Sequence, residues 1–69
     1  QLFSIVTITG RREVLIENYK GILEYTGEYI KIQTKNAKLT VYGKKLSIEY
    51  YTNEDMKVVG FVKSIEYEA

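Results

Sequence analysis

The side chains that could do chemistry here are three serines, one aspartate, eight glutamates and a group of lysines and tyrosines, because the sequence contains neither histidine nor cysteine. The imidazole base, the thiolate nucleophile and the most common metal ligands are therefore missing. Ser47 stands near Lys45 in an alternating stretch, where a strand-surface residue explains it better than a Ser–Lys dyad does. Glu54 and Asp55 follow a Thr-Asn pair and fit a turn better than a cation site. We expect no catalytic residue, no metal site and no cofactor, and hence no enzyme.

Lysines and tyrosines in the middle of the chain offer a candidate binding surface. Residues 29–48 carry five lysines and no acid, although the net charge of the whole chain is only +1. Tyrosine suits protein interfaces because it combines apolar area with a polar tip. We predict a surface for a partner or for self-association, made of Tyr29, Tyr42, Lys31, Lys38, Lys44 and Lys45. The alternative is that these side chains, together with Lys35, stack the bases and contact the phosphates of a single-stranded nucleic acid.

Short stretches of alternating apolar and polar residues must position these side chains. Residues 29–34 place Ile30 and Ile32 on one face of a strand and Lys31 on the other. Similar patterns predict further strands over residues 3–9, 13–17, 22–25, 38–42, 45–50 and 56–67. The residues expected to face inward with Ile30 and Ile32 are Leu39, Val41, Leu46, Ile48 and Tyr50.

The connections between these strands have the composition of tight turns. Lys35-Asn36 and Gly43-Lys44 offer residues that tolerate a positive φ, as two-residue hairpins require. Asn18 and Gly21 form a similar turn signature between the second and third strands. Turns of this kind join antiparallel neighbours, so we predict an all-β domain, a small antiparallel meander or roll of about six or seven short strands.

Evenly spaced glycines leave a second architecture open. Gly10, Gly27, Gly43 and Gly60 recur every 16 or 17 residues, and the sequence of residues 23–32 is similar to that of residues 39–48. This period also suits a short β-solenoid-like stack. The last of these glycines, Gly60, stands between apolar residues of opposite parity. It marks either a bulge that re-aims the final strand or the close approach of a neighbouring strand.

Length indicates a single domain over residues 1–69, and the start at Gln1 without an initiator methionine leads us to expect a domain excised from a longer protein. No apolar run is long enough to suggest a membrane span, so we expect a soluble domain with no direct membrane insertion. At this size folding buries only about 60% of the surface of the unfolded chain. Because no cysteine is present to form a disulfide, we expect a homodimer or small homo-oligomer.

Several segments together carry a family resemblance. The opening of the chain, Ile8-Thr9-Gly10 followed by residues 14–23, resembles the YabP/YqfC family of sporulation proteins and is closer to its YqfC branch. The most distinctive part is Ile16-Glu17-Asn18-Tyr19-Lys20-Gly21. The likeness continues through residues 29–32 and 39–48 and through Gly60, Val62 and Ile65, so that it covers nearly the whole chain.

This resemblance implies a non-enzymatic structural or protein-interaction module required in endospore formation by a spore-forming Gram-positive bacterium. The sequence itself does not indicate a location, and the expectation that goes with the resemblance is the cytoplasm of the sporulating cell, either the mother cell or the forespore. A membrane-bound sporulation protein of the YqfD type is the implied partner, and any membrane association would come through it. Two roles are open for Asn18 and Gly21: they form a turn after a strand, or they contact the partner directly.

Overall fold

The computed structural model describes residues 3–68, in which every regular element is a β-strand. Each strand pairs antiparallel with its neighbours, in the order β1-β2-β6-β5-β4-β3, to form one open six-stranded sheet. The predicted all-β roll is confirmed, whereas the solenoid alternative is wrong, since its coils would stack in parallel. The strands are β1 (Ile5–Thr9), β2 (Glu13–Glu17), β3 (Gly21–Tyr25), β4 (Tyr29–Gln33), β5 (Lys38–Tyr51) and β6 (Asp55–Glu68).

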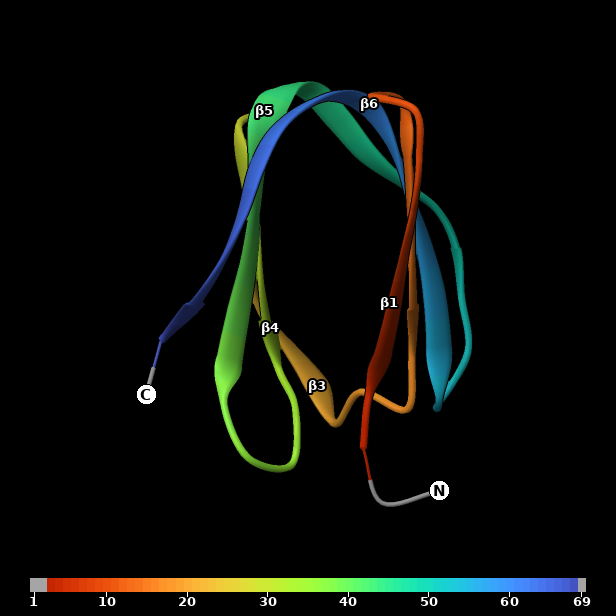
Figure 1. Cartoon of the computed structure of the whole chain (residues 1–69), viewed down its shortest axis with the longest axis vertical. Helices are drawn as coiled ribbons and strands as arrows, with labels where there is room; N and C mark the ends of the chain where they lie inside the picture. The colour runs from red at the N-terminus through yellow and green to blue at the C-terminus, as the bar shows by residue number, and fades with distance from the viewer. Residues whose placement is uncertain (1–2, 69) are drawn as a thin grey trace.

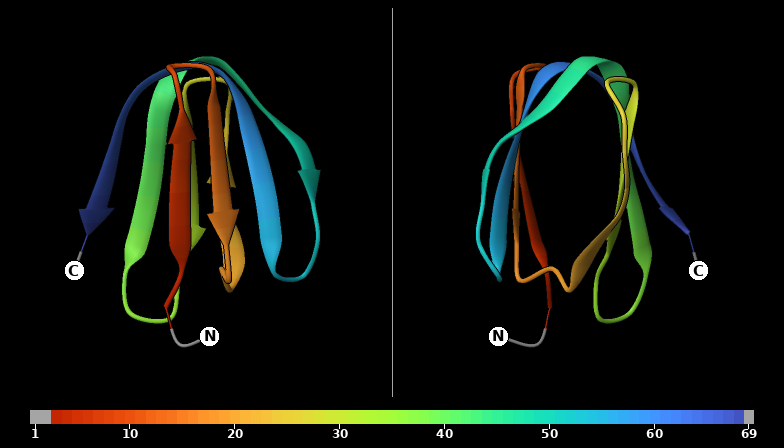
Figure 2. Two further views of the ribbon diagram at one scale, coloured as in Figure 1. Left: turned by 45° about the vertical axis from the view of Figure 1, so that its right-hand side comes forward. Right: turned by 180° about the vertical axis from the view of Figure 1, so that it is seen from behind.

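The sheet folds over on itself because its two longest strands, β5 and β6, bend midway (Figure 1). The first half of β6 pairs with β2 and with the second half of β5. The second half of β6 pairs with the first half of β5, which continues the sheet to β4 and β3. Two layers result, and the segment from β2 to β3 crosses between them at the end opposite the bend (Figure 2).

The core lies between the two layers. Alternation brings one face of β2, β4, β5 and β6 inward, and the confirmed core predictions are Ile30, Ile32, Leu39, Val41 and Leu46, with Ile48 packed at the margin. The other buried apolar residues are Val14, Ile16, Tyr19, Met56, Val58 and Val62. Tyr19 comes from the crossing segment and adds its side chain to the core.

β5 is continuous where the sequence predicts a hairpin turn at Gly43-Lys44. Gly43 pairs with Val62 and Lys44 pairs with Phe61, so the chain runs on through both residues as a strand. The predicted turn is wrong, and the two strands expected over residues 38–42 and 45–50 are one, which gives six strands, within the expected number of six or seven. The echo between residues 23–32 and 39–48 is likewise not structural, because Gly27 stands in the turn between β3 and β4 whereas its counterpart Gly43 stands inside a strand.

A bulge at Gly60 accounts for the bend. Lys45 and Leu46 together face Gly60 alone, because Lys44 pairs with Phe61 and Ser47 with Val59. Lys45 has a φ of 52° and Gly60 a φ of 138°. A Cβ atom on Gly60 would lie 2.5 Å from the carbonyl oxygen of Lys45. Both proposed reasons for this glycine therefore apply, and the extra residue of the bulge belongs to β5.

Two further bulges between β5 and β6 change which side chains face the core. An extra residue on β5, Glu49, lies between the pairs Ile48–Val58 and Tyr50–Lys57, so Tyr50 turns to the outer face. The prediction that Tyr50 faces inward is therefore wrong. On β6 the extra residue is Lys63, which switches the core-facing parity from Val62 to Ile65. This switch explains why apolar residues of both parities occur in that strand.

Candidate interaction surfaces

The two predicted surface tyrosines form a cross-strand pair. Tyr29 on β4 lies directly opposite Tyr42 on β5, with ring centroids 6.4 Å apart and planes tilted by 43°. Both are half-buried on the outer face of the layer. The Tyr29 hydroxyl donates a hydrogen bond to Glu24 over 2.9 Å, and this bond raises the pKa of Tyr29. The Tyr29 hydroxyl is therefore already engaged within the sheet.

Lys31 and Lys38 lie on the same outer face. The Lys31 ammonium is 3.7 Å from the Glu24 carboxylate and 3.8 Å from that of Glu68, so its charge is balanced across three strands. Lys38 is exposed and stands opposite Glu68 in register. A face on which lysines alternate with glutamates is a poor match for a phosphate backbone. Of these two lysines of the nucleic-acid alternative, Lys31 is therefore already paired with carboxylates.

Lys44 and Lys45 belong to a different region, the bend of the sheet. Both are exposed there, whereas Lys35 lies in the loop between β4 and β5 at the opposite end (Figure 1). Three cations that the sequence reasoning did not assign to the surface lie at the bend with them: Arg11, Arg12 and Lys63. These residues are far apart in the sequence, so a count of charges in short segments does not group them. The turn after β1 and the bulge in β6 come together only in the folded sheet.

A line of core-facing side chains stays uncovered between β1 and the second half of β6. On β1, Val6 pairs with the core residue Ile16 and Ile8 pairs with Val14. On β6, Ile65 pairs with the core residue Val41 and Tyr67 pairs with Leu39. Nevertheless, Ile8 is 55% exposed and Tyr67 is 62% exposed. We call the four residues Val6, Ile8, Ile65 and Tyr67 the open seam.

Surface hollows run along the open seam. One is lined by Ile8 and Ile65, and another by Phe3 and Tyr67. The backbone edges beside the seam are also open, because β1 pairs only with β2, and β2 pairs with β6 only over Asp55–Val59. The seam thus combines exposed apolar side chains with strand edges that have no strand partner within residues 3–68.

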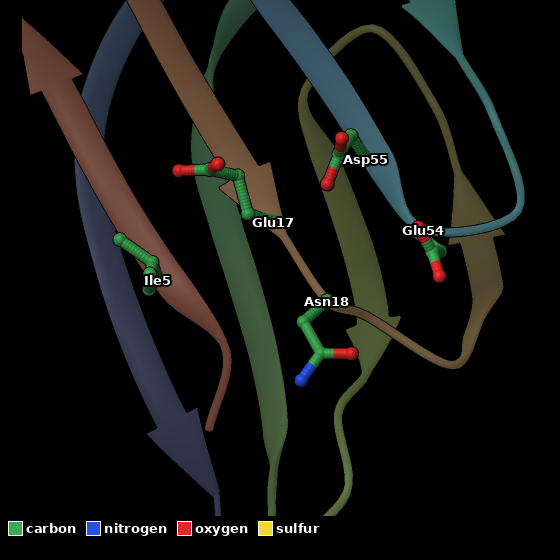
Figure 3. Close-up of a pocket in the computed structure, with 5 residues that line it drawn as sticks. All are labelled: Ile5, Glu17, Asn18, Glu54 and Asp55. Carbon is green, nitrogen blue, oxygen red and sulfur yellow. The ribbon is translucent and has the colours of Figure 1, made fainter. Parts of the chain in front are cut away.

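A third region is an acidic hollow, lined by Ile5, Glu17, Asn18, Glu54 and Asp55 (Figure 3). The labelled carboxylates point in different directions (Figure 3). The described residues contain no group of three or more acidic side chains arranged to hold a metal ion. The Thr52 hydroxyl accepts hydrogen bonds from the backbone amides of Glu54 and Asp55, at 3.1 and 3.0 Å. The predicted turn at this place is confirmed.

The turn signature residues Asn18 and Gly21 have separate roles. Asn18 has a φ of 64°, its backbone amide donates to the Glu54 carbonyl over 2.6 Å, and its side-chain amide donates to the Phe3 carbonyl over 3.1 Å. It therefore starts the crossing from β2 to β3 and fastens it to the neighbouring turn. Gly21 lies beyond the turn, as the first residue of β3.

Fold and surfaces together define a small, folded-over antiparallel sheet with an apolar seam and a cationic bend. The chain belongs to the YabP family, whose model matches residues 3–69. Among curated proteins it is similar to YqfC of Bacillus subtilis (strain 168), itself named as uncharacterized. The two are 24% identical over 62 residues, which cover 90% of this chain and 67% of that protein. No solved structure is significantly similar. None of the described residues forms a helix long and apolar enough to cross a membrane.

Proposed function

We propose that this chain is a non-enzymatic protein-interaction module of endospore formation, which takes a segment of another protein into the open seam. Membership of the YabP family and the similarity to YqfC support the link to sporulation. The single observation that carries the binding role is the exposure of Ile8 and Tyr67, which face the core side of the sheet yet remain more than half exposed. A membrane-bound sporulation protein, which the family resemblance implies, is the proposed occupant.

An added strand is the form of partner that fits the open seam best. A free strand edge offers amide and carbonyl groups to an incoming strand, and alternate side chains of that strand could enter the hollows. Completing the burial of Ile8 and Tyr67 would contribute about 3 kcal/mol. Backbone pairing would fix the register of the bound segment, while the apolar contact supplies most of the affinity.

Ile8→Lys is the direct test, with Ile5→Lys as its matched control. Both residues lie on β1 and both are exposed, but Ile8 faces the open seam whereas Ile5 faces away from the core. Each variant would replace the native gene in a spore-forming host. Crosslinked partners would be identified by mass spectrometry, and heat-resistant spores would be counted.

The charge placed in the seam should weaken partner capture at least tenfold, a loss of about 1.4 kcal/mol, and should lower the spore count. Ile5→Lys should behave as the native chain does. Circular dichroism and thermal melting would establish that both variants fold. A folded Ile8→Lys chain that keeps its partner and its spore count would contradict the proposal.

Self-association is proposed as a second property, and it can be separated from binding of a different protein. Sedimentation velocity at micromolar concentration should show a dimer or small oligomer. If the copies meet through the tyrosine pair, Tyr29→Ser combined with Tyr42→Ser should give monomers, whereas Ile8→Lys should do so if they meet through the seam. A compact monomer in every sample would rule out the homo-oligomer.

A further inference from the structure

Five cationic side chains gather where β5 and β6 bend. Each is exposed, and none forms an ion pair with a carboxylate of the described residues. By contrast, Lys31 and Lys57 on the outer faces each contact two glutamates. We call the five residues the basic end: Arg11, Arg12, Lys44, Lys45 and Lys63.

The backbone of the sheet holds the basic end together. The amides of Gly60 and Val62 donate hydrogen bonds to the carbonyl oxygens of Arg12 and Arg11, at 3.1 and 2.8 Å. These bonds dock the turn between β1 and β2 against β6. The bulge at Lys45 then places the lysines of β5 beside the same region. The five charges come from three separate elements whose relative positions the sheet determines.

An exposed aromatic ring lies among these cations. Phe61 is 50% exposed and lines one hollow together with Arg11, Lys44 and Lys63. The guanidinium of Arg12 lies 4.4 Å from the centroid of the Phe61 ring. Cations surrounding a half-exposed apolar ring are suited to a bilayer interface, where the charges meet anionic headgroups and the ring enters the boundary of the acyl region.

We infer that the basic end docks on an anionic lipid bilayer. Each Lys or Arg close to an anionic membrane strengthens binding by about fivefold. Glu28 lies at the same end, where its carbonyl oxygen accepts a hydrogen bond from the Gly43 amide, and its carboxylate offsets one charge of the five. The remaining excess supports reversible, salt-sensitive attachment of the folded sheet, with the bend toward the membrane.

A nucleic acid is a weaker match for the basic end. Binding of single strands depends on aromatic rings that are open for base stacking. One face of the Phe61 ring is already occupied by Arg12, and Tyr29 and Tyr42 pack against each other on the outer face of the layer. Binding to the headgroups of a bilayer does not require an open ring face, because the cations and the edge of the Phe61 ring are enough.

Vesicle binding tests this inference. The purified chain would be sedimented with vesicles of phosphatidylcholine alone and with vesicles that also contain phosphatidylglycerol. Lys44→Ala combined with Lys63→Ala should weaken binding to the anionic vesicles by about thirtyfold. The matched control is Lys20→Ala combined with Lys35→Ala, which removes the same charge from exposed positions outside the basic end. That control should change binding by less than about threefold.

A fluorescent probe reports which end meets the membrane. The chain has no tryptophan, so Phe61→Trp adds a single indole at the basic end, and Tyr51→Trp adds one at the end of β5, away from the bend. Anionic vesicles should shift the emission of the first variant to the blue and leave the second unchanged. Absence of binding at low salt, equal losses in both lysine pairs, or displacement from the vesicles by a short oligonucleotide would each overturn the inference.

Discussion

Tyr19 fastens the segment between β2 and β3 to the turn between β5 and β6. Its side chain is only 6% exposed, and its hydroxyl donates a hydrogen bond to the Thr52 carbonyl over 2.5 Å. Burial is the main cause that raises the pKa of Tyr19 above 10.0. The neutral phenol is thus favoured in the fold, since the phenolate would lose both its solvation and its donor hydrogen.

Tyr19→Phe is expected to lower the free energy of unfolding by about 1 kcal/mol at neutral pH, because the Thr52 carbonyl loses its donor. The native chain should also lose stability at alkaline pH. Because the folded pKa lies above the unfolded one, the contribution of Tyr19 is complete below pH 10.0 and disappears as the pH rises through the folded value. Tyr29 and Lys57, whose pKa values are also raised, act in the same direction. Urea denaturation of the native chain and of Tyr19→Phe between pH 7 and pH 11 would separate the contribution of Tyr19 from the others. If both proteins lost the same free energy of unfolding at alkaline pH, the proposed role of Tyr19 would be contradicted.

Thr40 is a buried polar residue on the outer face of the sheet. It is 1% exposed, lies in register with Lys31 and Glu66, and its hydroxyl oxygen forms no hydrogen bond with the described residues. Removing a buried hydroxyl of this kind costs no native hydrogen bond. Thr40→Val, which keeps the shape, should therefore raise the free energy of unfolding by about 1 kcal/mol. Thermal melting would check this, and Thr40→Ser, which keeps the hydroxyl, should bring no gain.

The bulge opposite Gly60 is the element on which the folded-over shape depends. Gly60→Ala should lower the free energy of unfolding by more than about 2 kcal/mol, because its φ of 138° disfavours any side chain and a Cβ would meet the Lys45 carbonyl. Gly27→Ala is the matched control, since a Cβ there would have no neighbour within 4 Å. Its effect should stay within about 0.5 kcal/mol. Urea denaturation would compare the two, and equal losses would show that the bulge tolerates a side chain.

Alternation predicted the elements well where a strand keeps strict pairing. β2 and β4 follow it throughout, and their core residues Ile16, Ile30 and Ile32 are fully buried. Prediction failed at the bulges, because one inserted residue reverses the parity of everything after it, as at Tyr50. The pair Gly43-Lys44 likewise resembles a turn in the sequence. Only the pairing of Gly43 with Val62 shows that it lies within β5. Such insertions depend on the partner strand, so a single strand's pattern does not reveal them.

At the scale of the molecule, the surfaces were less predictable than the core. The predicted lysine and tyrosine surface divides in two, with Lys31 paired on the outer face and Lys44 at the bend. The open seam has no sequence signal, since Ile8 and Tyr67 have the same pattern as buried residues. Their exposure follows from strand order, which leaves β1 without a second neighbour in the described sheet. Whether a side chain at the edge of a sheet is buried therefore depends on how the layers assemble, and the pattern of its own strand does not reveal it.

Strand order also determines how stability is distributed across the molecule. The first half of β6 has strand partners on both sides, whereas β1 and β3 form the edges of the described sheet. Amide hydrogen exchange at low protein concentration should therefore be slowest in residues 56–59 and much faster in β1 and β3, which can open without global unfolding. Raising the concentration, or adding the partner that the seam binds, should slow exchange in β1 selectively. If β1 were as protected as β6 in the isolated monomer, its edge would already be covered and the seam would be closed to a partner.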